Sequence, residues 1–145
     1  MTGYGRRATA EQVSEGIDLT GKYALVTGAN TGIGKETARV LALRGAHVTM
    51  ACRNQEKAEQ ARRQIVDISG GRIPIEQLDL LELDLNALAS VHKSAASFNA
   101  RGISLDLLIN NAGIMIPMER RTEDDFEAHL GINHLAHFLF TNLIM

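Results

Sequence analysis

The chain has 145 residues, the size of one domain, and its 45% hydrophobic and 22% charged residues are ordinary for a globular protein. A formal net charge of −2 argues against general binding to nucleic acids or membrane surfaces, and the lone cysteine, Cys52, excludes an internal disulfide. Because no stretch reaches the length of a membrane span and the first twenty residues lack an apolar signal core, we expect a cytoplasmic protein.

The chain opens with residues 1–18, which show no clear hydrophobic period, and we expect an N-terminal arm ahead of a domain of residues 19–145. Within the arm, residues 9–14 suggest a short helix with Thr9 as its cap. β-Forming side chains at 23–27 then predict a strand, and a glycine-rich turn leads into a helix that ends at Gly45. The apolar spacing of this helix predicts one face made of Ile33, Thr37, Val40 and Leu41.

Two more strand–helix pairs follow. Residues 46–51 predict a second strand, and residues 74–84 supply a third, mainly in their latter half at 81–83. Asn54 and Asn86 are the expected caps of the helices that come after them. Apolar residues at intervals of three and four predict the inward faces: Ala58, Ala61, Ile65 and Ile68 in the first helix, and Leu88, Val91, Ala95 and Phe98 in the second.

The last pair begins with residues 105–109, a nearly all-apolar strand of the kind that is covered on both faces. Thr122 with Asp125 three residues later resembles a capping box, and a helical pattern runs from there to the end of the chain. The order βαβαβαβα predicts parallel strands with right-handed crossovers, which is an α/β, Rossmann-type doubly wound sheet. Ligands of such sheets bind at the carboxyl ends of the strands.

The first strand end carries the glycine-rich turn, with the spacing G-x-x-x-G-x-G over residues 28–34. We assign Gly28 to the tight turn, Gly32 to close approach of a ligand, and Gly34 to packing of helix against strand. A helix N-terminus has free N–H groups and favours an anion, so the turn predicts a phosphate site. The alternative is a loop that uses glycine for its geometry only.

The second strand end carries Arg53 and no carboxylate. An acidic residue here would bind a free ribose 2′-hydroxyl, whereas an arginine suits a 2′-phosphate, so the sequence favours NADP over NAD. The alternative is a surface arginine at a helix start, although a cation there opposes the helix dipole.

The third and fourth strand ends carry Asp84 with Leu85, and the run from Asn110 through Asn111 and Ala112 to Gly113. The Asp84 carboxylate could accept a hydrogen bond from an adenine amino group, or it could simply be an acid at a helix N-terminus. Two amides followed by two small residues suit close approach of a flat, sugar-bearing ligand, with an Asn-rich turn as the alternative.

Four strings together resemble the short-chain dehydrogenase/reductase superfamily: TGANTGIG at 27–34, Asp84-Leu85, NNAG at 110–113, and NHLAHFLFTNL at 133–143. The ACRN string at 51–54 is similar to members of the retinol dehydrogenase and WW-domain-oxidoreductase type. The arm and first strand look like the Tic32-type relatives of the plant chloroplast envelope, and the resemblance runs from about Thr9 to the last residue.

The resemblance implies a role for each matching residue. Pyrophosphate and the adenosine ribose would contact Gly28, Asn30, Thr31, Gly32, Ile33 and Gly34. Arg53 would bind the 2′-phosphate, and adenine would lie between Asp84 and Leu85. The ribose on the nicotinamide side would contact Asn111, Ala112 and Gly113, and Asn133 matches the family's catalytic asparagine, which kinks its helix and holds a water in the proton relay.

The sequence departs from the family pattern in its catalytic half. The family uses a serine and a Tyr-x-x-x-Lys motif, in which the lysine lowers the pKa of the tyrosine that acts as general acid and base. Here the tyrosines are Tyr4 and Tyr23, and the chain ends within the helix that contains Asn133. We therefore expect a chain truncated before that motif, inactive alone, and a homo-oligomer or aggregate because 105–109 becomes an unpaired apolar edge.

Three functions fit these features. The first is an NADP-dependent oxidoreductase that moves hydride between nicotinamide and a small carbonyl or alcohol substrate, present here as its cofactor-binding half. The second is a nucleotide-binding module without catalysis, and the third is an interaction module, for which the Tic32-like arm is the hint. That arm also makes a chloroplast-type location the alternative to the cytoplasm.

The histidines offer one candidate metal pattern, because His134 and His137 lie three residues apart on one helix. No cysteine or carboxylate converges with them in the sequence, and the family string accounts for both. We expect no metal site.

Overall fold

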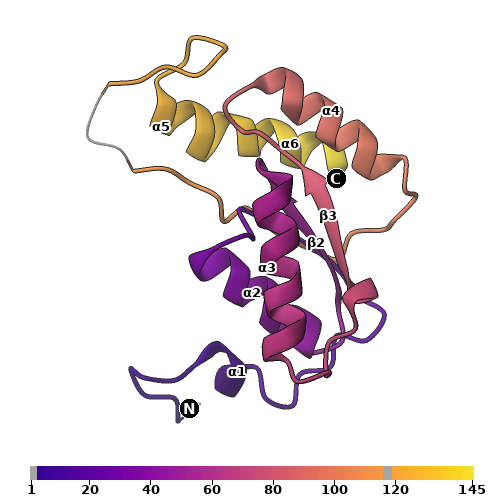
Figure 1. Cartoon of the computed structure of the whole chain (residues 1–145). Helices are drawn as coiled ribbons and strands as arrows, with labels where there is room; N and C mark the ends of the chain where they lie inside the picture. The colour runs from indigo at the N-terminus through magenta and orange to yellow at the C-terminus, as the bar shows by residue number, and fades with distance from the viewer. Residues whose placement is uncertain (1–2, 116–118) are drawn as a thin grey trace.

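The computed structural model describes residues 3–115 and 119–145, and Figure 1 shows strands alternating with helices along most of the chain. In chain order the elements are α1 (Ala10–Val13), β1 (Tyr23–Thr27), α2 (Gly32–Leu43), β2 (His47–Cys52), α3 (Gln55–Ile68), the 3₁₀ turn η1 (Ile75–Gln77), β3 (Leu78–Glu82), α4 (Leu88–Asn99), β4 (Leu107–Ile109), α5 (Ala128–Leu130), the π-helical turn η2 (Gly131–Leu135) and α6 (Ala136–Ile144).

The strands form one parallel sheet in the order β3-β2-β1-β4. The central strand β1 pairs Val26 with Met50 of β2 and with Ile109 of β4, so the sheet extends in opposite directions from β1. This order has the topological switch point beside β1, where ligands of doubly wound sheets bind. The predicted Rossmann-type fold is confirmed.

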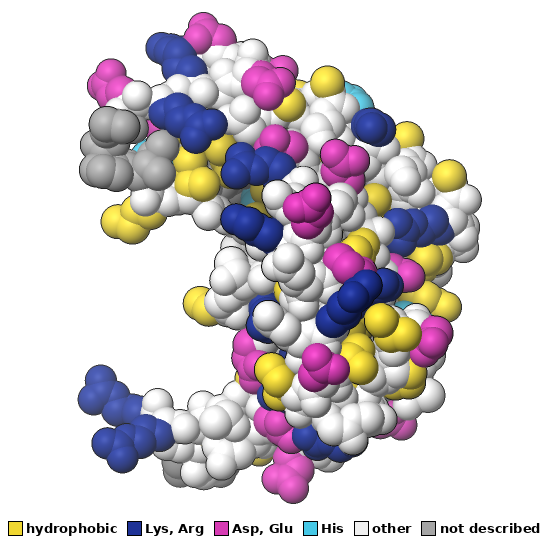
Figure 2. All heavy atoms as spheres, viewed as in Figure 1, with side chains coloured by type: hydrophobic (Ala, Val, Ile, Leu, Met, Phe, Trp, Pro, Cys, Tyr) yellow, Lys and Arg dark blue, Asp and Glu magenta, His cyan; other side chains and the backbone are white. Residues whose placement is uncertain are grey.

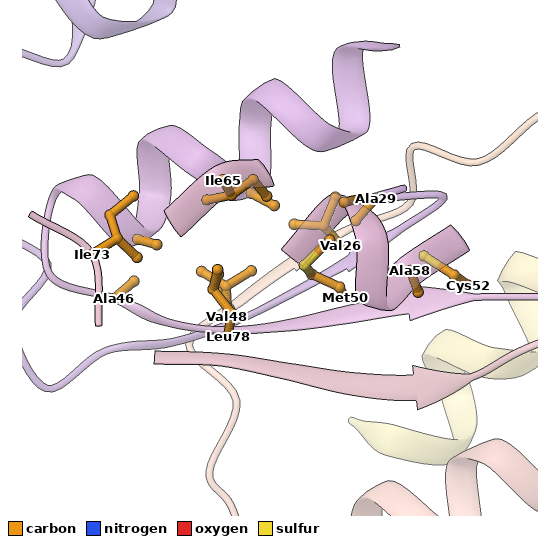
Figure 3. Packing of buried hydrophobic residues seen from close by; sticks show 14 residues of the cluster. Val26, Ala29, Ala46, Val48, Met50, Cys52, Ala58, Ile65, Ile73 and Leu78 are labelled. Carbon is orange, nitrogen blue, oxygen red and sulfur yellow. The ribbon is translucent and has the colours of Figure 1, made fainter. Parts of the chain in front are cut away.

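The two faces of the sheet bury separate hydrophobic cores. Ala24 and Val26 of β1 point to one face, with Ala58 and Ile65 of α3, and Figure 3 shows this cluster between the helices and the sheet. Leu25, between them in sequence, belongs to the other face, with side chains from α4 and α6 that include Val91, Phe98 and Phe140. Alternation along β1 therefore builds a helix layer on each side.

The predicted inward face of α2 is wrong at its start. Ile33 is 81% exposed, and the helix instead packs on Gly34, Ala38 and Ala42, whose small side chains allow close approach to the sheet. Arg39 is buried although it was not expected inside, because its guanidinium pairs with Glu36 and with Glu11 of the arm.

In α3 the cap at Asn54 is confirmed, since its side chain accepts from the Lys57 amide at 2.8 Å. Ala58, Ala61 and Ile65 are buried as predicted, but Ile68 is 64% exposed. Ile68 is the last residue of the helix, and the core beside it is filled by Ile73 from the following turn.

Strand boundaries differ from the sequence prediction. The second strand is shifted by one residue, to 47–52 instead of 46–51. The third, at 78–82, lies within the predicted 74–84 but begins three residues before the favoured part at 81–83. The fourth spans only 107–109 instead of 105–109, and its side chains are half-buried. It lies at the edge of the described sheet, beside β1, and it is packed on both faces as predicted, with Leu107 and Ile109 against one core and Leu108 against the other.

Two predicted helix starts are wrong. In α4 the inward faces at Val91, Ala95 and Phe98 are confirmed, but Asn86 is not the cap; the first amide, at Leu88, donates to Asp124 from a distant loop at 2.8 Å. The final helix does not begin at Thr122. Asp125 has a φ of 64° and belongs to a turn, and the helix begins at Ala128, capped by the side chain of Glu127.

The arm lies against α2. Thr9 caps α1 in a capping box with Gln12, as expected, and Glu11 forms ion pairs with Arg39 and Arg72. Arg44 at the end of α2 donates to the Glu11 carbonyl and to Ser14. The division at residue 18 remains a prediction, but these contacts join the arm to the sheet domain.

Across residues 3–115 and 119–145 no helix is both long and apolar enough to cross a membrane.

Candidate functional site

A cleft of about 160 Å³ opens at the carboxyl ends of the strands. Of the predicted residues it is lined by Gly28, Asn30, Arg53, Asp84, Leu85, Ala112 and Gly113. Residues from the ends of β1, β2 and β3 and from the segment after β4 thus meet at one place, as the parallel topology requires. Thr31, Gly32, Ile33, Gly34, Asn111 and Asn133 are not in this lining, and their positions are described below.

The glycine turn has the geometry that its spacing predicted. Gly28 has a φ of +67°, and a Cβ there would lie 3.0 Å from Ala112, so a side chain fits neither the backbone nor the space. A Cβ on Gly34 would lie 2.5 Å from the Gly28 carbonyl and would also overlap the Asn111 amide. Gly34 therefore lets α2 pack against the end of β4, and Gly28 makes the turn.

The N-terminus of α2 is open. Thr31 is its N-cap residue but its side chain makes no capping hydrogen bond, so it leaves the first-turn amides uncapped. Gly32 has a φ of +54°, and a Cβ there would meet nothing within 4 Å. Ile33 in the same turn is also exposed. The N-terminus of this twelve-residue helix therefore presents uncapped backbone donors and the positive end of its dipole to open space.

The end of β2 brings Arg53 to the cleft. Its side chain is exposed, and in the described part of the chain it forms no hydrogen bond or ion pair. Its neighbour Cys52 is buried, and burial raises the pKa of that thiol to about 11, so it stays protonated at neutral pH. The cation at this strand end therefore has no partner within the described protein.

The end of β3 is held by a tight turn. The Asp84 carboxylate accepts from the Asn86 amide at 2.9 Å, and the Asp84 amide donates to Ser90 of α4 at 3.0 Å. Leu85 is buried beneath this turn. One carboxylate oxygen of Asp84 is thus occupied, and the turn presents its other side to the cleft.

Asn111 links two strands. Its side-chain amide donates to the Thr27 carbonyl at 2.8 Å, and the Ala112 amide donates to the Thr27 hydroxyl at 3.0 Å. These bonds join the end of β4 to the end of β1, so Asn111 shapes the cleft from behind. Ala112 and Gly113 form the lining in front of it.

Asn133 lies in the π-helical turn η2, a local departure from α-helical geometry at the position where the kink was expected, and the kink itself stays a prediction. Its side-chain oxygen accepts from the Ile114 amide at 2.8 Å, and its side-chain nitrogen donates to the Ile114 carbonyl at 3.0 Å. Both ends of the amide are therefore used to hold the segment after β4 in place.

Sequence reasoning missed several residues of this region. Thr27 and His137 form a buried hydrogen bond of 2.9 Å behind the cleft, and Asn86, Ile114 and Ile132 complete its wall. A polar residue at the end of a buried strand could have marked Thr27. His137 gave only a spacing with His134, and the structure separates that pair, since His137 is buried while His134 is exposed beside Phe138.

Neither tyrosine reaches the cleft. Tyr23 begins β1, at the opposite end of the strand, and stacks on His47 with ring centroids 5.1 Å apart. Tyr4 lies in the arm. Among residues 3–115 and 119–145 no three or more potential metal ligands lie together. The absence of a metal site stays a prediction.

A model of the short chain dehydrogenase family matches residues 22–145. The chain therefore belongs to the short-chain dehydrogenase family, a family of oxidoreductases that bind NAD or NADP, as the motifs indicated. It is 49% identical to mouse retinol dehydrogenase 11 over 89% of this chain and 40% of that protein. It is also 41% identical to the chloroplastic short-chain dehydrogenase TIC 32 B of Brassica napus, over 99% of this chain and 44% of that protein.

Solved structures agree. A protein from Mycobacterium paratuberculosis superposes with a TM-score of 0.73 at 43% identity, over 88% of this chain and 43% of its own. A gluconate 5-dehydrogenase from Burkholderia cenocepacia, solved with NADP and tartrate, has a TM-score of 0.66 at 33% identity, over 88% and 48%. The chain spans about two fifths of the length of the curated relatives it matches.

Proposed function

We propose that this chain is the cofactor-binding half of an NADP-dependent short-chain oxidoreductase, which moves hydride between nicotinamide and a small carbonyl or alcohol substrate. The observation that carries the proposal is the unpaired Arg53 at the end of β2, on the same cleft as the glycine turn. In sheets that bind NAD, a carboxylate is favoured at the end of β2. Here Arg53 follows β2, and the carboxylate of Glu82 is at the end of β3 instead.

The described residues fit a dinucleotide. The uncapped amides of α2 beside Gly32 would bind pyrophosphate, with Asn30, Thr31, Ile33 and Gly34 around the same turn. Arg53 would pair with the ribose 2′-phosphate, and Asp84 with Leu85 would hold adenine. Ala112 and Gly113, fixed from behind by Asn111, would contact the second ribose. The neighbour solved with NADP supports this assignment by analogy.

Bound nicotinamide would supply or accept the hydride. The chain's own residues hold the cofactor and shape the cleft, while Asn133 fixes the segment after β4. Proton transfer needs the serine and Tyr-x-x-x-Lys that this sequence lacks, and both tyrosines lie away from the cleft. We therefore propose binding without turnover by this chain alone.

A titration with NADPH and with NADH, followed by nicotinamide fluorescence, tests the proposal. The chain should bind NADPH with micromolar affinity, and Arg53→Glu should weaken NADPH by at least about tenfold while changing NADH little. Arg63→Glu on the outer face of α3 is a matched control, because it makes the same charge change at a residue that pairs with Glu59. Equal affinity for both nucleotides, or equal effects of the two variants, would contradict the NADP assignment.

The location of the protein stays a proposal as well. Composition favoured the cytoplasm, whereas the TIC 32 relatives are named as chloroplastic. A fluorescent fusion of the full chain would separate the two locations.

A further inference from the structure

A closed set of hydrogen bonds runs behind the cleft and ends on a histidine with no assigned role. The Ala112 amide donates to the Thr27 hydroxyl at 3.0 Å, and that hydroxyl lies 2.9 Å from Nε2 of His137. Nδ1 of His137 lies 3.2 Å from the carbonyl of Asn133, whose side chain holds Ile114. Ile114 follows Ala112 by two residues, so the circuit closes through the cleft lining.

The chemistry of these partners fixes the proton on the imidazole. A backbone carbonyl only accepts, so Nδ1 must carry a hydrogen to bond Asn133. His137 is 5% exposed, and burial lowers the pKa of its imidazole, with the Asn133 carbonyl opposing that effect; the ring is therefore neutral at pH 7. A neutral ring with hydrogen on Nδ1 has a bare Nε2, which accepts from the Thr27 hydroxyl.

The direction of every bond follows. Ala112 N–H donates to Thr27, the Thr27 hydroxyl donates to Nε2, and Nδ1–H donates to the Asn133 carbonyl. Each group uses the role that it has available, and no donor in the circuit is left over. Each bond also joins a different part of the fold: β1, the segment after β4, the π-helical turn and α6.

We propose that His137 is a positioning residue of the cofactor cleft, which, as the neutral Nδ1–H tautomer, ties the Asn133 turn to the end of β1 and so fixes residues 112–114 in the cleft lining. Its importance for cofactor binding rests on the function proposed above, but the tautomer and the bonding do not. The hydrogen bonds of His137 go to Thr27 and Asn133, and it acts on the cleft lining through these two residues.

The imidazole state can be read without any substitution. Nitrogen NMR of the wild-type chain should report one neutral ring at pH 7 with hydrogen on Nδ1 and a bare Nε2 for His137, identified as the signal lost in His137→Phe. A protonated ring, or hydrogen on Nε2, would overturn the proposal.

Variants test the positioning. His137→Phe keeps the ring volume and removes both bonds of the imidazole. Thr27→Val removes the bond at Nε2 together with the bond that the hydroxyl accepts from Ala112. Amide hydrogen exchange should become faster at both Ile114 and Ala112 in His137→Phe, because the groups that accept from these amides are held less firmly. At Ala112 in Thr27→Val, where the amide loses its own acceptor, exchange should become at least about tenfold faster. Exchange at Met50, buried in the β2 ladder, should stay the same. Unchanged exchange at Ile114 and Ala112 would overturn the proposal.

Two further variants, each of which can restore one of the two lost hydrogen bonds, distinguish positioning by His137 from general packing. His137→Asn places an amide near Nδ1 and should restore the bond to Asn133, whereas His137→Gln reaches toward Nε2 and should restore the bond to Thr27. Ile114 exchange should therefore be slower in His137→Asn than in His137→Phe, and Ala112 exchange slower in His137→Gln. Two variants with the same exchange as His137→Phe would speak for simple packing.

NADPH affinity completes the test, with weaker binding by about three- to tenfold expected in His137→Phe and partial recovery in His137→Asn. If the wild type does not bind NADPH, the proposed function fails, and the tautomer and exchange measurements still decide the positioning of residues 112–114. If the wild type binds and His137→Phe binds equally well, the positioning role in the cleft fails alone.

Discussion

Gly34 packs so closely against the ends of β1 and β4 that a single methyl group has no room. A Cβ would lie 2.5 Å from the Gly28 carbonyl, which is backbone and cannot move aside cheaply. We expect Gly34→Ala to lower the free energy of unfolding by about 2–3 kcal/mol through overpacking, measured by urea unfolding.

Gly113→Ala is the matched control for this substitution. A Cβ at Gly113 would meet its nearest atom, Oδ1 of Asn133, at 3.4 Å, an ordinary contact distance. It should change the free energy of unfolding by less than about 0.5 kcal/mol. Equal losses in the two alanine variants would show that close packing does not explain Gly34.

Residue-level predictions from sequence succeeded where the backbone itself imposes the requirement. The glycine spacing identified the turn at Gly28 and the packing at Gly34, because the positive φ of Gly28 and the contact of Gly34 with the Gly28 carbonyl arise within one short stretch of chain. Roles that depend on distant segments could not be read in this way. His137 meets Thr27 across 110 residues of sequence, and its family string gave it no partner.

At the scale of elements, α4 begins with a cap supplied from a distant loop. The Asp124 carboxylate accepts from the Leu88 amide at 2.8 Å, and the neighbouring Glu123 amide donates to the Asn86 carbonyl at 3.0 Å. This loop therefore holds both the helix start and the turn after β3.

Asp124→Ala should lower the free energy of unfolding by about 1 kcal/mol, as loss of a helix cap does. Asn54→Ala, which removes the local cap of α3, is the reference and should cost about the same. Urea unfolding measures both. A loss confined to Asn54→Ala would mean that the Asp124 contact contributes nothing to α4.

Element order and the inward faces of α3 and α4 were predictable because hydrophobic period reports burial directly. The segment between β4 and α6 was not. Thr122 and Asp125 have the spacing of a capping box, but the Thr122 amide donates to the Phe126 carbonyl in a short turn, and the helix begins later. The local sequence favoured a helix start here, but this loop forms a turn whose contact with the start of α4 determines its conformation.

At the scale of the whole molecule, buried His137 makes stability depend on pH. Burial holds the pKa of its imidazole in the folded chain below the 6.5 of the unfolded chain. Below pH 6.5 the unfolded chain therefore binds more protons, and the free energy of unfolding should fall by up to about 1.4 kcal/mol per pH unit until the folded pKa is reached.

Urea unfolding between pH 8 and 5 measures this dependence, and His137→Gln should lose it. Carboxylates act in a lower window: hydrogen bonds from the His129 and Leu130 amides lower the pKa of Glu127 to about 2, so its contribution is lost only below its ordinary range near 4.5. An identical pH slope in wild type and His137→Gln would contradict the account of His137.

The same molecule exposes apolar surface on its last helix and leaves the edge of β4 unpaired within the described sheet. Phe138 of this helix is 62% exposed, and Leu130 of the preceding α5 is 49% exposed. Figure 2, by contrast, shows positive and negative side chains interspersed over the visible face of α3, a surface suited to water. We expect the isolated chain to self-associate, and Phe138→Lys should lower its average mass in light scattering. A sharp monomer peak for the wild type would contradict this expectation.

If the ends of β1, β2 and β3 form one dinucleotide cleft, NMR mapping of bound NADPH should locate the cofactor at these strand ends. Amide signals should shift at Gly32 and Ile33, at Arg53, and at Asp84 and Leu85, while those of the arm stay in place. Shifts confined to other surfaces, such as the hollow between β3 and α4 around Lys93 and Ser97, would contradict the assignment of the cleft. A folded chain whose spectrum NADPH leaves unchanged would contradict the proposed function itself.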